Sequence, residues 1–164
     1  MTQSDLVEQL KTPFRFLFDD YGYAVIASKL YDNSENWVVV LESATCGRFL
    51  VLHDRGEIIV ALGPAQTQLW TDGPWFDLGV IAEYLSQGQD MLAATRGDLR
   101  RQLDTWAAAL EPYMEEIRQL FSPAVFEDAQ RDLDRIGERR EEELRQQRGG
   151  SNGHRPPADG RYDL

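Results

Sequence analysis

Residues 37–62 limit the fold most strongly, because apolar strand-like segments alternate there with very short connections. These segments are rich in Val, Ile, Leu and aromatic residues, as β-strands are. Two parallel strands need a crossover of about a dozen residues or more, and no connection here is longer than five. The spacing therefore predicts an antiparallel meander of four strands, at residues 23–31, 37–42, 48–53 and 57–62.

The predicted strands are apolar on both faces. In the strand of residues 37–42, Trp37, Val39 and Leu41 fall on one face, and Val38 and Val40 fall on the other. A sheet with one face in water is usually polar at every second position. We therefore expect either helices on both faces, or helices on one face and another chain on the other.

Helical patterns flank the strands on both sides. We expect a helix over residues 4–20 that bends at Pro13, and a short helix capped by Asp77. A long helical stretch is predicted from about Gln89, with a kink or restart at Pro112. Ser122 and the proline after it predict the start of the last helix. The fold class is therefore α+β: an N-terminal helix, a four-stranded antiparallel β-meander, and C-terminal helices for which a helical hairpin is one arrangement.

The chain divides by composition into a body and a charged end. Residues 1–137 have the apolar content of a single α+β domain. Residues 138–148 alternate acids and arginines, which predicts a solvated helical extension supported by pairs four residues apart. Residues 149–164 are almost without apolar side chains, and we expect them to be disordered.

The net charge of −11 restricts the classes of partner. Phosphate neutralisation requires Lys and Arg, so an acidic body argues against nucleic acid and anionic membranes as partners. A protein partner, in particular a basic one, fits this charge. No apolar run approaches the ~20 residues of a membrane span, and the N-terminus has no signal-peptide layout. We therefore expect a cytoplasmic protein.

The sequence predicts no metal, cofactor or catalytic site. Cys46 is the single cysteine, and the two histidines, His53 and His154, lie far apart, so a structural zinc site has too few ligands. No phosphate-binding glycine loop, serine nucleophile elbow or zinc-protease motif occurs. Acid pairs such as Asp19 and Asp20 are expected by chance in so acidic a chain. We expect a protein that is not an enzyme.

Two short segments are candidates for partner contact. Trp70, Trp75 and Phe76 lie around the loop that follows the strands, where aromatic side chains can anchor a partner or close the core. Asp54 and Arg55 form the turn between the last two strands. His53 precedes them, and this is the one cluster of imidazole, carboxylate and guanidinium. Adjacent strand residues point to opposite faces, so ordinary turn chemistry explains the cluster as well as an acid–base site does.

The order of several motifs is similar to a class of small uncharacterised bacterial proteins, which look like the immunity-type proteins that accompany toxin loci. The resemblance covers roughly residues 14–85 and implies a role, not a catalytic residue. The helices after Gln89 and the arginine-rich end lie outside it. The motifs that carry it are LFDDYGY (17–23), NWVVVLES (36–43), DRGEI (54–58) and WFDL (75–78).

Three functions remain open at this stage. The preferred hypothesis is a non-enzymatic bacterial protein-binding module of immunity or antitoxin type, which presents an acidic surface to a protein partner. One alternative is a helical oligomerisation or assembly factor that pairs through its C-terminal helices. The other alternative is an unrecognised enzyme that uses His53 and nearby carboxylates.

Overall fold

An antiparallel sheet forms the centre of the computed structural model, which describes residues 2–31, 36–67, 69, 73–92 and 97–149. Within these ranges the sheet has five strands in the order β1-β2-β3-β4-β5, so each strand pairs with the next one in the chain. The meander and the α+β class predicted from the sequence are confirmed. The strands are β1 (Ala24–Leu30), β2 (Trp37–Ser43), β3 (Gly47–Asp54), β4 (Glu57–Gly63) and β5 (Phe76–Asp77).

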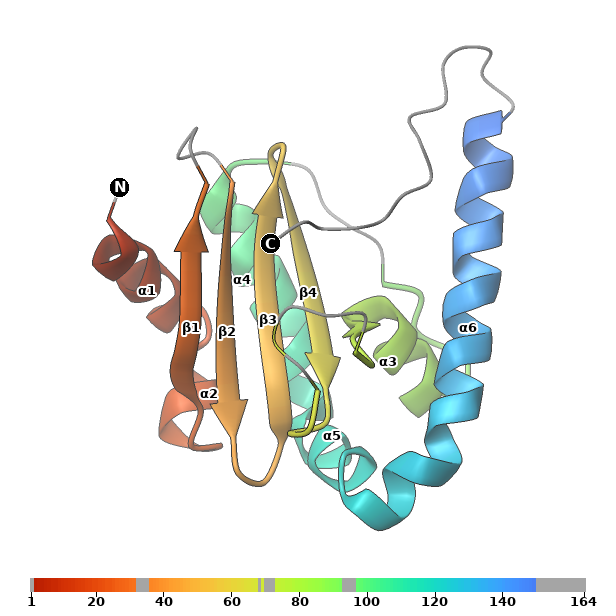
Figure 1. The fold of residues 1–164 in the computed structure, drawn as a ribbon. Helices are drawn as coiled ribbons and strands as arrows, with labels where there is room; N and C mark the ends of the chain where they lie inside the picture. The colour runs from red at the N-terminus through yellow and green to blue at the C-terminus, as the bar shows by residue number, and fades with distance from the viewer. Residues whose placement is uncertain (1, 32–35, 68, 70–72, 93–96, 150–164) are drawn as a thin grey trace.

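Helices cover one face of the sheet and extend past one edge. α1, α4 and α5 lie behind the sheet in Figure 1, whereas α3 and α6 lie beyond β4. No helix in the described ranges is both long enough and apolar enough to cross a membrane. The helices are α1 (Gln3–Lys11), α2 (Arg15–Asp19), α3 (Leu78–Leu85), α4 (Leu99–Leu110), α5 (Met114–Leu120) and α6 (Pro123–Gly149), with a 3₁₀ turn, η1 (Glu111–Tyr113), before α5.

The helix predicted over residues 4–20 is two helices. α1 begins at a capping box, in which the Thr2 hydroxyl accepts from the backbone N–H of Asp5 and the Asp5 carboxylate accepts from Thr2. The helix therefore starts one residue before the predicted start at residue 4. The chain breaks at residues 12–14, because the proline at position 13 has no N–H to donate. Both short helices and the break between them still contribute buried side chains to the core: Leu6, Leu10, Phe14 and Leu17.

The face behind the sheet is the main core. Directly opposed residues in neighbouring antiparallel strands share a face, and the register aligns Val39, Val51 and Val60 in one row across three strands. All three are completely buried. α4 and α5 pack over this face. Its other strand residues are Trp37, Leu41, Phe49, Ile58 and Leu62, and the helices cover them with Leu103, Trp106, Leu110, Met114, Ile117 and Leu120.

Two side chains of α4 bond the backbone of β4. The Gln102 Oε1 accepts from Ile58 N–H at 2.9 Å, and its Nε2 donates to the carbonyls of Gly56 and Gly97 at 2.8 and 2.9 Å. The Trp106 Nε1 donates to the Ile58 carbonyl at 3.1 Å. Gln102 is 1% exposed, and its amide oxygen and nitrogen both have hydrogen-bond partners, as buried polar groups usually do.

Of the C-terminal helices, α4 starts later than the sequence predicted, whereas the next two starts agree with the prediction. α4 begins at Leu99 with Asp98 as its N-cap, not near Gln89, so Leu92 lies outside it. The restart predicted at Pro112 is confirmed as the turn η1. α6 begins at Pro123 as predicted and continues to Gly149, so the charged segment is part of the same helix. Val125, in the first turn of α6, is 44% exposed.

We predict that Gln102→Ala lowers the free energy of unfolding by about 2–4 kcal/mol, because it leaves a buried N–H and two carbonyls without partners. Urea unfolding measures the loss. Gln119→Ala, at an exposed position on α5, is the matched control and should change stability by less than about 0.5 kcal/mol. An equal loss in both variants would contradict the role given to the Gln102 amide.

The β3–β4 turn offers a second test. Arg55 and Gly56 have φ angles of 51° and 84°, the pattern of a two-residue turn in which both central residues are left-handed. Asn tolerates this conformation better than Arg does. Arg55→Asn should therefore raise stability by about 0.5–1 kcal/mol in thermal unfolding, and Gly56→Ala should lower it, since a Cβ there meets no neighbour and only the strained φ remains. A loss on Arg55→Asn would show that the arginine side chain stabilises the turn.

Candidate interaction surface

The face of the sheet turned away from α4 carries two apolar rows. The register places Val38, Leu52 and Ile59 side by side, and it places Val40, Leu50 and Ala61 in the next row. We call these six residues, with Ala27 and Ile26 of β1, the outer face. In Figure 1 this face is toward the viewer, and no described helix lies across it.

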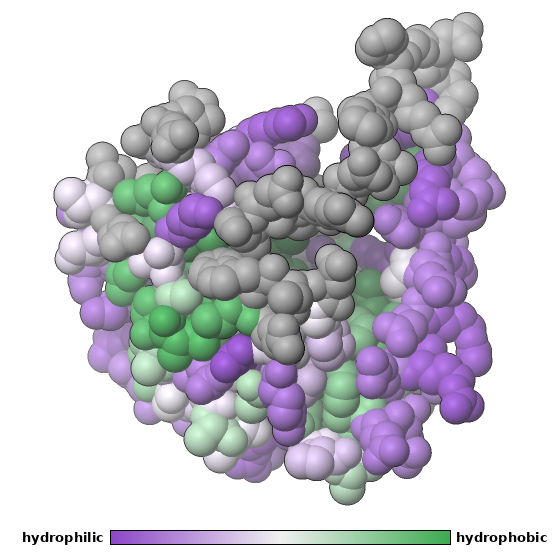
Figure 2. Space-filling view, in the orientation of Figure 1, coloured by the Kyte–Doolittle hydropathy of each residue, from purple (hydrophilic) through white to green (hydrophobic). Residues whose placement is uncertain are grey.

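Exposure on the outer face differs from strand to strand and is lowest on β2. Val38 and Val40 are 1% and 0% exposed, whereas Leu50, Leu52 and Ile59 keep part of their surface exposed. Ile26 is 41% exposed, at the point where a β-bulge shifts the register of β1 between Val25 and Ala27. Figure 2 shows the hydrophobic surface over this part of the sheet.

Paired charges border the outer face. Arg48 Nε donates to Glu42 Oε2 at 2.6 Å, and Arg48 also donates to the Thr67 carbonyl. Lys29 Nζ lies 5.1 Å from the centre of the Tyr31 ring, a cation–π distance. An apolar centre with a polar rim is the usual composition of a protein–protein interface.

A cleft of about 890 Å³ opens between the start of β4 and the second half of α6. Met91 and Leu144 stand at its walls and are 57% and 51% exposed. α6 carries mostly hydrophilic residues on its outer side, which is the right-hand margin of Figure 2. The apolar and aromatic residues that line the cleft are Ile58, Ile59, Trp75, Phe76, Val80, Met91, Leu92, Trp106, Leu133 and Leu144.

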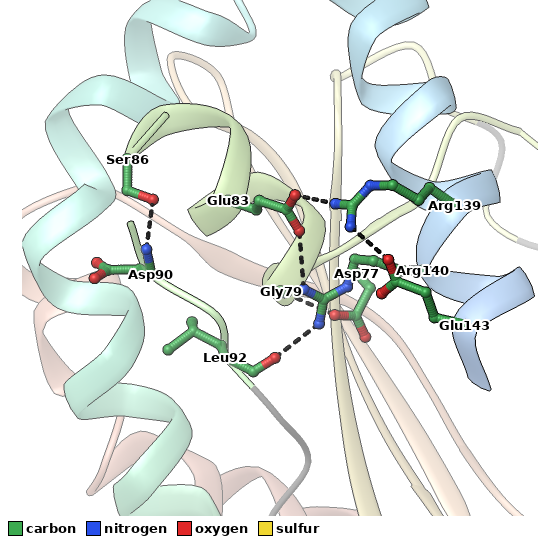
Figure 3. Close-up of polar contacts among 9 residues, drawn as sticks. All are labelled: Asp77, Gly79, Glu83, Ser86, Asp90, Leu92, Arg139, Arg140 and Glu143. Carbon is green, nitrogen blue, oxygen red and sulfur yellow. Dashed lines mark hydrogen bonds and ion pairs between the residues drawn. The ribbon is translucent and has the colours of Figure 1, made fainter. Parts of the chain in front are cut away.

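An ion-pair cluster joins the two helices at this cleft. Glu83 of α3 is 8% exposed and contacts two arginines of α6 (Figure 3). Its carboxylate accepts from Arg139 and, at 3.2 Å, from Arg140 Nη1. Arg140 also donates to the Leu92 carbonyl at 2.7 Å, and Arg139 donates to Glu143 at 2.8 Å. The cluster therefore connects α3, α6 and the chain segment before residue 93.

The start of α3 packs tightly against the same arginine. Asp77 caps the helix by accepting from Gly79 N–H at 2.7 Å. A Cβ at Gly79 would lie 2.5 Å from Arg140 Nη2 and 2.9 Å from Asp77 Oδ1, so a side chain there would displace the guanidinium or the carboxylate. Desolvation raises the pKa of the Asp77 carboxyl, and the Gly79 N–H and Arg140 oppose that effect. The N-cap predicted at Asp77 is confirmed, whereas the two-residue strand that precedes it was not predicted.

Four of the five residues predicted to contact a partner are described, and they lie in two places. Trp75 lines the cleft and is partly exposed; Phe76 also lines it but is 6% exposed and packs edge-on against Phe126. Asp54 and Arg55 form a loose pair, 3.9 Å apart, at the β3–β4 turn. Trp70 lies outside the described residues.

His53 and Cys46, which the sequence analysis considered for catalysis or metal binding, take part in packing and hydrogen bonding within the fold. His53 stacks on Trp37, with ring centres 5.5 Å apart. Cys46 is buried, and its carbonyl accepts from the Tyr23 hydroxyl at 3.1 Å. Burial raises the pKa of that tyrosine. In the part of the chain that the structure describes, no group of three or more His, Cys, Asp or Glu side chains could hold a metal ion.

Sequence reasoning did not identify Glu83, Met91 or Leu144. Glu83 had a usable signal, because it is the one charged residue in the helix LGVIAEYL and Arg139 and Arg140 are adjacent in the last helix. Met91 and Leu144 had none, since a single apolar residue in a polar segment is common on protein surfaces. Their importance comes from facing each other across a cleft.

Comparison with known proteins identifies no relative: no family model, no curated protein and no solved structure matches the chain.

We predict that Glu83→Ala lowers the free energy of unfolding by about 3 kcal/mol, because it removes the carboxylate that Arg139 and Arg140 share. Arg140→Ala should cost about 2 kcal/mol, because it leaves the buried Glu83 carboxylate with one arginine instead of two. Arg139→Ala should cost less, since this side chain is 45% exposed. Urea unfolding ranks the three stability losses. Amide hydrogen exchange in residues 138–149 should be faster in Glu83→Ala and Arg140→Ala than in the wild type. Asp104→Ala breaks the exposed Arg100–Asp104 pair and is the control. An equal loss in that control would contradict a specific role for the buried cluster.

Proposed function

We propose that the protein is a non-enzymatic protein-binding module and that its partner docks on the outer face of the sheet. The observation that carries this proposal is the pair of apolar rows across β2, β3 and β4, over which no described helix lies. Contiguous apolar surface of this kind marks interaction sites in soluble proteins. The paired charges around it supply the rim that such sites have.

Charge favours a separate, basic protein over a second copy of the chain. Each copy carries a net charge of −11, so docking two copies face to face brings like charges together. A basic partner gains attraction from the same charge and associates faster at low salt. Nucleic acid is disfavoured for the reason that a second copy is, since it is itself strongly negative.

The resemblance of residues 14–85 to immunity-type proteins gives this proposal a specific form. In that form the protein is bacterial and cytoplasmic, and the partner is a toxin whose activity is blocked by binding. Finding a gene for such a toxin beside the gene for this protein would support the specific form. Co-expression tests it, since growth should be restored by the wild-type chain and not by a variant with an altered outer face.

We predict that Leu50→Lys abolishes binding to the partner while leaving the fold intact. The lysine stem can cover the sheet as leucine does, and its ammonium repels a basic partner. Pull-down from the source cell at low salt, with wild-type and variant chains compared side by side, should yield a protein lost specifically with Leu50→Lys. Titration of that purified protein should show affinity reduced at least about 100-fold.

Val125→Lys is the matched control, because this valine is an exposed apolar residue of α6 that is outside the outer face and the cleft. It should bind as the wild type does. A variant ending at Gly149 tests whether residues 150–164 affect access to the outer face. Light scattering tests whether a second copy of the chain is the partner. A dimer that Leu50→Lys breaks would overturn the proposal. A partner that binds Leu50→Lys as tightly as the wild type would also overturn it.

A further inference from the structure

We infer that the cleft between β4 and α6 is a second binding site, which accepts an amphipathic helix with a basic polar side. The cleft has an apolar lining, and exposed apolar residues stand on two walls. Leu144 projects from α6 and Met91 from the segment before residue 93, so both side chains are available to an incoming apolar stripe. The inference does not depend on what binds the outer face.

A helix fits this site better than a strand does. Strand addition requires free N–H and C=O groups along the edge of the sheet. At Ile58, which lines the cleft, the N–H is bonded to Gln102 and the carbonyl to Trp106. The opposite wall is α6, whose backbone is bonded within its own helix. The cleft therefore offers apolar side chains rather than backbone groups.

The charges around the cleft favour a basic occupant. Its lining contains five acids and two arginines. Arg140 is already engaged by Glu83 and by the Leu92 carbonyl, which reduces the positive charge available to a ligand. Lys or Arg on the flanks of an incoming helix would meet four acidic side chains at the lip: Glu57, Asp134, Glu141 and Glu143. Glu141 and Glu143 already pair with Arg145 and Arg139, so Asp134 is the carboxylate on which the charge preference is tested.

The dimensions match a short helix. The wall formed by residues 133–148 of α6 is about 24 Å long at ~1.5 Å per residue, which is a little over four helical turns. An occupant of that length presents apolar anchors at positions i, i+3 or i+4, and i+7, the usual pattern of a helix in a groove. The arginines that fix this wall to α3 keep the cleft open at a defined width.

The test uses the full chain and a fluorescent peptide of about 14 residues, with Leu along one helical face and Lys on the other. The peptide should bind saturably in fluorescence anisotropy. Leu144→Lys and Met91→Lys should each weaken binding at least about tenfold, and Val125→Lys should have no effect. A peptide with Glu in place of every Lys, and one with a central Pro, should bind at least about tenfold more weakly.

A matched pair of variants tests charge separately from apolar contact. Asp134 lines the cleft, whereas Asp132 of the same helix pairs with Arg135 and does not line it. Asp134→Lys should weaken binding of the basic peptide more than Asp132→Lys does, although both substitutions change the net charge equally.

Three results would overturn the inference: equal affinity for the Glu peptide, no effect of Leu144→Lys, or no difference between the two aspartate variants. Loss of the peptide with Leu50→Lys alone would place it on the outer face, which removes the cleft as a site and leaves the proposed function standing. A partner protein lost with Leu50→Lys and kept with Leu144→Lys, together with the expected peptide results, would establish two independent sites.

Discussion

The apolar character of β2, β3 and β4 on both sides is the constraint on which the rest of the structure depends. One side is covered by α1, α4 and α5 and becomes the core. The other side carries Val38, Leu52 and Ile59 in one row with a second row beside it. Each apolar side chain of this size removed from water contributes about 1.5–3 kcal/mol. Val38 and Val40 are already buried, so a partner on this side gains stability from covering the exposed parts of Leu50, Leu52 and Ile59.

Hydrogen bonds and an irregular register determine where another strand cannot add to an edge of the sheet. Gln102 and Trp106 close the edge of β4 at Ile58, so a foreign strand has no backbone groups to pair with there. Farther along the same strand, β5 pairs with Ala61 and Leu62. The bulge at Ile26 disturbs the register of β1 at the other side of the sheet. Association by edge pairing is thus opposed, and association through side-chain surfaces is left.

The sequence predicted what depends on local patterns. Runs of apolar β-forming residues and short turns identified β1 to β4, and the Asp77 cap and Pro112 restart followed from residue chemistry. β5 was missed because two residues give no pattern, and the start of α4 was misplaced because Leu92 continues the helical spacing by chance. The cleft could not be predicted, since it depends on how α6 is attached to α3 through Glu83 and on which side of β4 the helix then runs.

The buried cluster at Glu83 is costly to form, and its position explains why it is useful. A carboxylate that is removed from water beside two partly exposed arginines gains little stability over an apolar contact of the same size. An apolar contact would, however, let α6 slide or rotate along α3, because such packing has no fixed register. Glu83 bonds both arginines while Arg140 also bonds the Leu92 carbonyl, so the helix has one angle and one register. The tight fit of Gly79 against Arg140 restricts the angle further. With that angle fixed, Leu144 stands apart from the sheet and the cleft stays open, which a helix held only by apolar packing would tend to close.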